Sequence, residues 1–72
     1  MLQKKLGKRI ASLRKNRKLT QEQMAEALGC SVEFISLVER GVNAPSVAGL
    51  EKFAKILKVE VKELFIFEEK KQ

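Results

Sequence analysis

Residues 19–41 constrain the fold of this chain most, because they predict two short helices joined by a glycine turn. Thr20 and Gln23 form a T-x-x-Q capping box, which predicts a helix over residues 21–28. Gly29 follows directly and is expected to end that helix, since glycine readily adopts the positive φ that such a turn requires. A second helix is therefore expected to begin within a few residues of Gly29.

The second predicted helix covers residues 32–40 and begins after Ser31, whose hydroxyl can cap it. Its apolar residues recur every three positions, at Val32, Ile35 and Val38. Ala25 lies where the two helices are expected to cross, and its small side chain permits a close approach. Residues 20–40 thus have the pattern of a helix-turn-helix, which can place its second helix in the major groove of DNA, about 12 Å wide.

Apolar periodicity predicts three further helices around this pair. The first helix has one apolar stripe, formed by Leu2, Leu6, Ile10 and Leu13. A fourth helix is expected after the loop at residues 41–46, because Pro45 interrupts helical geometry and Ser46 can cap a new helix. Its expected core residues are Leu50, Phe53, Ala54 and Leu57.

A short fifth helix is expected at about residues 61–65, and its residues Val61, Leu64 and Phe65 are expected to close the core. Together these elements predict an all-α fold, a compact five-helix bundle. The chain is expected to form a single domain over residues 1–72, with its core at about residues 6–66 and a tail at residues 67–72.

Positive charge is concentrated at the N-terminal end of the chain. Residues 1–18 contain eight Lys or Arg residues and no acidic residue, whereas the rest of the chain contains seven basic and nine acidic residues. The cluster is therefore expected to contact nucleic-acid phosphates, with an affinity that falls as the salt concentration rises. For any single lysine, a solvated position on the helix surface is an equally good interpretation.

Several classes of function are disfavoured by the residues that the chain lacks. It has no histidine and no aspartate, and it is too short to enclose a substrate, so we predict that it is not an enzyme. Cys30, the only cysteine, permits no internal disulfide and no ordinary zinc site. We interpret Cys30 as a small turn residue, with a redox-sensing thiol as the alternative. No cofactor, metal ion or small-molecule ligand is predicted.

Hydropathy gives no sign of a membrane span or a signal peptide, because the chain has no apolar run of sufficient length. A cytoplasmic protein without a membrane partner is therefore expected. A chain of this size buries only about 60% of its unfolded surface, which weakly favours a dimer.

The segment over residues 10–65 resembles the Cro/phage-repressor type of helix-turn-helix domain, also called the xenobiotic-response-element family of bacterial regulators. The resemblance is carried by Arg14, Leu19, Thr20, Gln21, Ala25, Leu28, Gly29, Ser31, Ile35, Ser36, Glu39, Arg40, Gly41, Asn43, Pro45, Ser46, Leu50, Ala54, Leu57, Val61, Glu63, Leu64 and Phe65. It implies a lambda-repressor-like domain in a prokaryotic, nucleoid-associated transcriptional regulator that binds double-stranded DNA sequence-specifically. It further implies a homodimer on a two-fold symmetric operator. A stand-alone repressor, a restriction–modification controller and an antitoxin-type autoregulator fit equally well.

Two residues depart from the pattern of this family. Lys58 stands where the resemblance implies a glycine in the left-handed conformation, which would cost another residue about 1 kcal/mol. We therefore expect the fourth helix to end differently. Gly49 lies inside the predicted fourth helix, at a cost of up to about 1 kcal/mol relative to alanine.

The resemblance assigns base contacts to exposed positions of the second motif helix: Val32, Glu33, Ser36 and Leu37. Glu33 can accept a hydrogen bond from cytosine N4, Ser36 can pair with several base edges, and Val32 can pack against a thymine methyl group. No residue between 32 and 38 is basic, so limited base specificity, supplemented by DNA shape, is expected. Alternatively, Val32 and Leu37 lie at the rim of the core.

The residues expected to contact the DNA backbone are Gln21, Ser31, Phe34, Arg40 and Asn43. Gln21 is well placed to bind a phosphate, because the first turn of a helix directs free N–H groups and a positive dipole outward. Simpler interpretations are a neighbour of the cap for Gln21 and a turn residue for Asn43. Phe34 either stacks at the wall of the groove or packs against the fourth helix.

Arg14 and Glu39 have a structural role according to the resemblance, which implies an ion pair between the first and third helices. Removing one partner of such a pair would cost about 3–5 kcal/mol if it is buried and about 0–1 kcal/mol if it is exposed. The burial of this pair therefore decides how much it contributes to stability.

A second function from another class also fits the sequence. The chain could be a protein-interaction adaptor that uses the apolar residues Val32, Phe34 and Leu37 to bind a partner and binds DNA only non-specifically. Ile66 and Phe67, at the start of the tail, are either frayed or the edge of a dimer interface.

Overall fold

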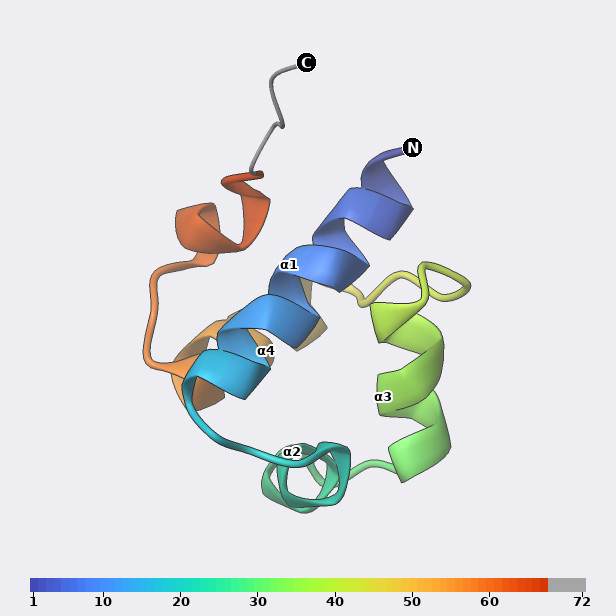
Figure 1. The fold of residues 1–72 in the computed structure, drawn as a ribbon, viewed down its shortest axis with the longest axis vertical. Coiled ribbons are helices and arrows are strands. Elements are labelled where there is room, and N and C mark those ends of the chain that lie inside the picture. Colours follow the sequence, from blue (N-terminus) through green and yellow to red (C-terminus); the bar gives the residue numbers. More distant parts are fainter. Residues whose placement is uncertain (68–72) are drawn as a thin grey trace.

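The structure is a computed structural model that describes residues 1–67, and this part of the chain folds into helices without a β-strand (Figure 1). The elements are α1 (Leu2–Asn16), α2 (Gln21–Leu28), α3 (Val32–Glu39), α4 (Val47–Leu57) and the 3-10 helix η1 (Val61–Phe65). In Figure 1, α1 crosses the middle of the molecule, with α3 on one side, η1 on the other and α4 behind it. The predicted all-α class is confirmed.

Over residues 1–67, the predicted five-helix bundle is corrected to four α-helices, because the segment expected as the fifth helix forms the 3-10 helix η1. Its geometry shows in the bond from the Glu63 N–H to the Glu60 carbonyl oxygen, three residues earlier, at 2.9 Å. The tighter 3-10 winding suits a piece of only five residues. Leu64 is fully buried, but Val61 and Phe65 are each 37% exposed, so the expectation that all three close the core was wrong for two of them.

α2, α3 and α4 begin where their capping residues predict, and α3 ends at Glu39, one residue before the predicted end. The Thr20 hydroxyl accepts a hydrogen bond from the Gln23 N–H at 3.0 Å, and Gln23 Oε1 accepts one from the Thr20 N–H at 2.9 Å. Ser31 and Ser46 accept from the N–H groups of Phe34 and Gly49, each at 3.0 Å, and so cap α3 and α4. The capping box and both serine caps are confirmed, and each satisfies donors that a helix leaves free in its first turn.

The core collects apolar side chains from every helix. The buried set consists of Leu6, Ile10, Met24, Ala25, Ile35, Val38, Phe53, Ala54, Leu57 and Leu64. Leu13 and Leu50, predicted for the core, are partly buried and pack against this set. Leu2 does not extend the stripe of α1, because its side chain is 61% exposed at the end of the helix, beyond the packed elements.

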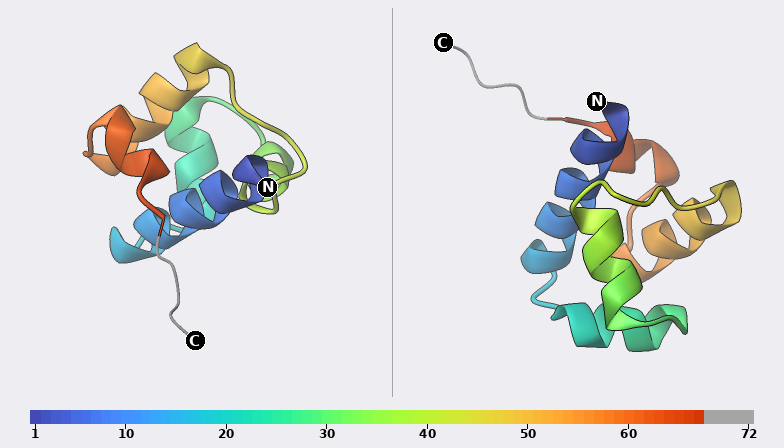
Figure 2. Two further views of the ribbon diagram at one scale, coloured as in Figure 1. Left: turned by 90° about the horizontal axis from the view of Figure 1, so that it is seen from above. Right: turned by 90° about the vertical axis from the view of Figure 1, so that its right-hand side faces the viewer.

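Gly7 lets α1 approach the end of α3 closely, a feature that the periodicity analysis did not find. A Cβ atom at Gly7 would lie 2.3 Å from the carbonyl oxygen of Val38 and 2.7 Å from that of Glu39. Real Cβ atoms do not approach backbone oxygens this closely, so a side chain here would force the helices apart. The right-hand view of Figure 2 shows α1 and α3 side by side, and the two helices are in contact.

The end of α4 corrects the expectation for Lys58. This residue has φ 61° and ψ 44°, the left-handed conformation, and its N–H donates to the Lys55 carbonyl oxygen at 3.2 Å. The helix thus ends in the same way as it would with glycine, and Lys58 bears the steric cost of about 1–2 kcal/mol. The favourable burial of Leu57 and the partly buried Val59 on either side holds the turn in place.

Within the described part of the chain, none of the helices has the length and apolar character needed to cross a membrane.

Candidate nucleic-acid interface

α2 and α3 cross steeply and are joined by a tight turn at Gly29. In Figure 1, α2 is seen end-on while α3 runs up the page. Gly29 adopts φ 76°, as predicted, and its N–H donates to the Ala25 carbonyl oxygen at 2.8 Å. Ala25 is buried in the core, and α2 packs against α3. The turn therefore sets the angle between α2 and α3.

The side chains of α3 are divided between the core and the solvent. Ile35 and Val38 are fully buried, whereas Val32 and Glu33 are exposed. Ser36 and Leu37 are partly buried. Phe34 is partly buried and packs against the core cluster. Of the four residues predicted to contact bases, Val32 and Glu33 are thus the most accessible.

The residues predicted to contact the DNA backbone lie at the ends of α2 and α3. Ser31 and Arg40 are exposed directly before and after α3. Asn43 is partly buried, and its backbone N–H donates to the Leu37 carbonyl oxygen at 3.2 Å, which gives it a role in the turn after α3. Gln21 is partly buried at the first position of α2. The motif thus brings Gln21 and Arg40 close to the same end of α3, where Glu39 contacts Gln21.

Arg14 and Glu39 form a buried ion pair between α1 and α3. Arg14 Nε lies 2.6 Å from Glu39 Oε2, and Arg14 Nη2 donates to Oε1 at 3.1 Å. The two side chains are only 10% and 7% exposed. Arg14 Nη1 also donates to the Leu19 carbonyl oxygen at 2.7 Å, so one guanidinium joins α1, α3 and the segment before α2. Such a bidentate arrangement favours arginine over lysine.

Two contacts of this region were missed by sequence reasoning. Gln21 Nε2 donates to Glu39 Oε1 at 3.0 Å, and Gln3 Nε2 donates to the Val42 carbonyl oxygen at 3.2 Å. Both join residues far apart in the sequence, so no local spacing announces them. The second contact attaches the first turn of α1 to the loop after α3.

The basic cluster of residues 1–18 is largely exposed on α1 and in the turn after it. Its exposed members are Lys4, Lys5, Lys8, Lys15, Arg17 and Lys18. Two members have structural contacts instead: Arg14, in the ion pair, and Arg9, whose Nε donates to the Glu63 carbonyl oxygen at 2.8 Å. The cluster therefore both ties α1 to its neighbours and gives the surface a strong positive charge.

Cys30 lies in the turn between α2 and α3, partly buried against the core. Burial raises the pKa of its thiol above the ordinary value, because desolvation disfavours the thiolate. This environment fits the interpretation of Cys30 as a turn residue, since a reactive cysteine needs a lowered pKa.

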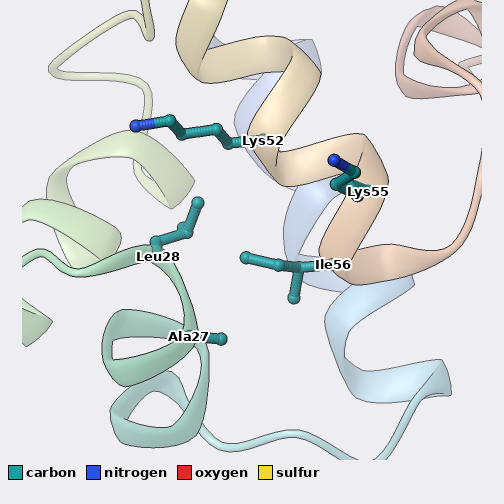
Figure 3. Close-up of a pocket in the computed structure, with 5 residues that line it drawn as sticks. All are labelled: Ala27, Leu28, Lys52, Lys55 and Ile56. Atoms are coloured by element: carbon teal, nitrogen blue, oxygen red, sulfur yellow. The ribbon is translucent and has the colours of Figure 1, made fainter.

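A shallow cavity of about 320 Å³ opens between α2 and α4 (Figure 3). Its lining residues are Ala27, Leu28, Lys52, Lys55 and Ile56. None of the residues predicted to contact DNA lines it, so it lies apart from the candidate interface.

The architecture and the exposed helix α3 define a helix-turn-helix domain. The sequence profile of the helix-turn-helix family HTH_3 matches residues 10–64, and the chain belongs to this family. The chain is 41% identical over 58 residues to an uncharacterized helix-turn-helix transcriptional regulator, YazB, from Bacillus subtilis, an alignment that covers 81% of this chain and 84% of YazB.

Two solved structures show the same fold. The restriction-modification controller protein C.AhdI from Aeromonas hydrophila superposes with a TM-score of 0.82 at 35% identity, over 86% of this chain and 94% of that one. SinR, described as a master regulator for biofilm formation and solved in complex with DNA, superposes with a TM-score of 0.76 at 33% identity, over 82% of this chain and 95% of that one. The family and the relatives are those of transcriptional regulators rather than enzymes.

Proposed function

We propose that this protein is a transcriptional regulator, a repressor or autoregulator, that binds double-stranded DNA by placing α3 in the major groove. The observation that carries the proposal is that α3 has one buried side and one exposed side. Ile35 and Val38 anchor the helix in the core, whereas Val32 and Glu33 remain exposed. A helix presented in this way fits the width of the groove. SinR, which shares the fold, was solved in complex with DNA, and this supports DNA binding by the present chain.

The proposal assigns distinct roles to the residues of the motif. Val32, Glu33, Ser36 and Leu37 would contact base edges. Gln21, Ser31, Arg40 and Asn43 would contact phosphates at the ends of the two helices, and Phe34 would lie at the edge of the contact. The exposed lysines of α1 would add attraction that depends on salt rather than on sequence.

We also propose that the protein acts as a homodimer on a two-fold symmetric operator. Apolar side chains are exposed at the start of α1 and directly after η1: Leu2 is 61% exposed and Ile66 is 53% exposed. Phe65 and Phe67 add an edge-to-face aromatic pair with ring centroids 6.3 Å apart. A second copy of the chain would cover these side chains and place two α3 helices on one face of the DNA.

The adaptor alternative is favoured by one observation, the lack of basic residues between 32 and 38. A helix without Arg, Lys, Asn or Gln offers few strong contacts to bases. The two functions differ in whether a preferred DNA sequence exists.

Selection of binding sites from a random pool of duplex DNA tests the proposal. The expected result is a two-fold symmetric motif whose half-sites lie about one helical turn apart. Titration of the selected duplexes at low and high salt would then show affinity beyond that for an arbitrary duplex. Salt-sensitive binding without any motif would contradict the proposal and support the adaptor.

A further inference from the structure

The carboxylate of Glu39 is shared by side chains from two other helices. From α1, Arg14 donates to both oxygens, at 2.6 Å and 3.1 Å, and from α2, Gln21 Nε2 donates to Oε1 at 3.0 Å. The Glu39 side chain is only 7% exposed, so these bonds form away from water. A single buried carboxylate thus fixes a side chain at the first position of α2.

Gln21 retains donors after this bond is made. Its Nε2 carries two hydrogens, and the bond to Glu39 uses one of them. Its backbone N–H lies in the first turn of α2, where a helix offers no internal acceptor, and the Thr20 hydroxyl accepts from Gln23 instead. Two N–H groups of the same residue are therefore available for an anion at the positive end of the helix dipole.

We infer that Glu39 is a positioning residue for DNA binding, which holds the carboxamide of Gln21 so that its second N–H and its backbone N–H bind one backbone phosphate. This inference rests on the proposed function and deepens it. A side chain that is already fixed loses less conformational freedom on binding than a mobile one does. Arg14 also contributes, because its positive charge neutralises the Glu39 carboxylate, which would otherwise repel the phosphate.

A double-mutant cycle separates this role from a merely structural one. Gln21→Ala is measured in the wild-type protein and in a background that carries Arg14→Met together with Glu39→Met. Replacing a buried ion pair by apolar side chains often leaves stability unchanged, whereas removing one partner does not, so this background keeps the net charge and removes the acceptor for Gln21. The measurement is the Kd for a duplex from the random-pool selection, by fluorescence anisotropy, at a temperature where circular dichroism shows every variant folded.

We expect Gln21→Ala to weaken binding by about tenfold or more in the wild-type protein, as for the loss of one charge-assisted hydrogen bond, and less than twofold in the apolar background. Glu39→Gln alone serves as a third background, because it keeps an acceptor oxygen for Gln21. In this background, Gln21→Ala is expected to weaken binding nearly as much as in the wild-type protein. An equal loss of affinity on Gln21→Ala in both backgrounds would overturn the inference. It would also be overturned if Gln21→Ala changed the Tm of the wild-type protein without changing its Kd for the duplex.

A second measurement covers the case in which the apolar background does not fold. In ¹⁵N-labelled wild-type protein without DNA, the Nε2 proton of Gln21 that is bonded to Glu39 is expected to lie downfield of the Nε2 protons of the exposed Gln23 and to exchange more slowly with water. The other Nε2 proton of Gln21 is expected to move on saturation with the duplex. Shifts and exchange rates equal to those of Gln23 in the free protein would overturn the positioning role. Failure of the wild-type protein to bind any duplex would instead overturn the proposed function and, with it, this inference.

Discussion

At the scale of single residues, Gly7 sets how closely α1 can approach α3. We predict that Gly7→Ala lowers the free energy of unfolding by about 1–3 kcal/mol or more, because the new Cβ would overlap the backbone oxygens of Val38 and Glu39. Urea denaturation measures the change. Gly49→Ala is the matched control, since its Cβ would meet only side-chain atoms of Pro45 and Ser46, in a tight contact at 3.3 Å rather than an overlap with backbone, and alanine favours a helix. Equal effects at both glycines would contradict the packing role of Gly7.

Cys30 gives a prediction about reactivity at the same scale. Alkylation proceeds through the thiolate, and burial raises the pKa of this thiol, so less thiolate is present at neutral pH than in a solvent-exposed cysteine. We expect iodoacetamide to react several-fold more slowly with the folded protein than with a short cysteine peptide at pH 7.5. The rate should continue to rise at pH values where the rate of the peptide has levelled off. A faster reaction than that of the peptide would favour a redox-sensing thiol.

At the scale of elements, the ion pair of Arg14 and Glu39 joins α1 to α3. Because both side chains are at most 10% exposed, Arg14→Ala leaves a buried carboxylate without its positively charged partner and is expected to cost about 3–5 kcal/mol of unfolding free energy. Chemical denaturation, with binding to the selected duplex measured alongside, tests this expectation. Lys15→Ala removes an exposed neighbouring charge and should change stability by no more than about 0.5 kcal/mol. An unchanged denaturation midpoint for Arg14→Ala would show that the pair does not hold the helices together.

The elements also show how far the sequence predicts this structure. Helix starts at Thr20, Ser31 and Ser46 could be predicted because a cap is a contact between residues three positions apart. The 3-10 winding of η1 could not, because a five-residue segment has too little periodicity to distinguish the two kinds of helix.

The candidate site was predictable to a different degree. Capping and periodicity placed α3 and its exposed side chains, because both depend on local spacing. The bond between Gln21 and Glu39 joins residues 18 positions apart. Its formation depends on the angle between α2 and α3, which the packing of the whole domain determines.

At the scale of the whole molecule, the exposed apolar side chains of Leu2 and Ile66 give a prediction about dimer formation. We expect Ile66→Glu to raise the dimer dissociation constant at least about tenfold, because a charge would have to lose its water in the interface. Sedimentation equilibrium measures the constant. Ile66 is 53% exposed, so the stability of the monomer should change little. Val47→Glu, at an exposed valine elsewhere on the molecule, should leave association unchanged. A wild-type protein that stays monomeric at high concentration would contradict the dimer.

The division of α3 has a further consequence. Ile35 and Val38 hold the helix to the core, while Glu33 contributes no buried surface. In the proposed mode of binding, a substitution at Glu33 therefore changes what the helix offers to DNA but leaves folding almost unchanged, usually within about 0.5 kcal/mol. After a gene duplication, one copy could acquire a new operator by single-codon changes on this outer surface, without passing through a form that is too unstable to survive in the cell.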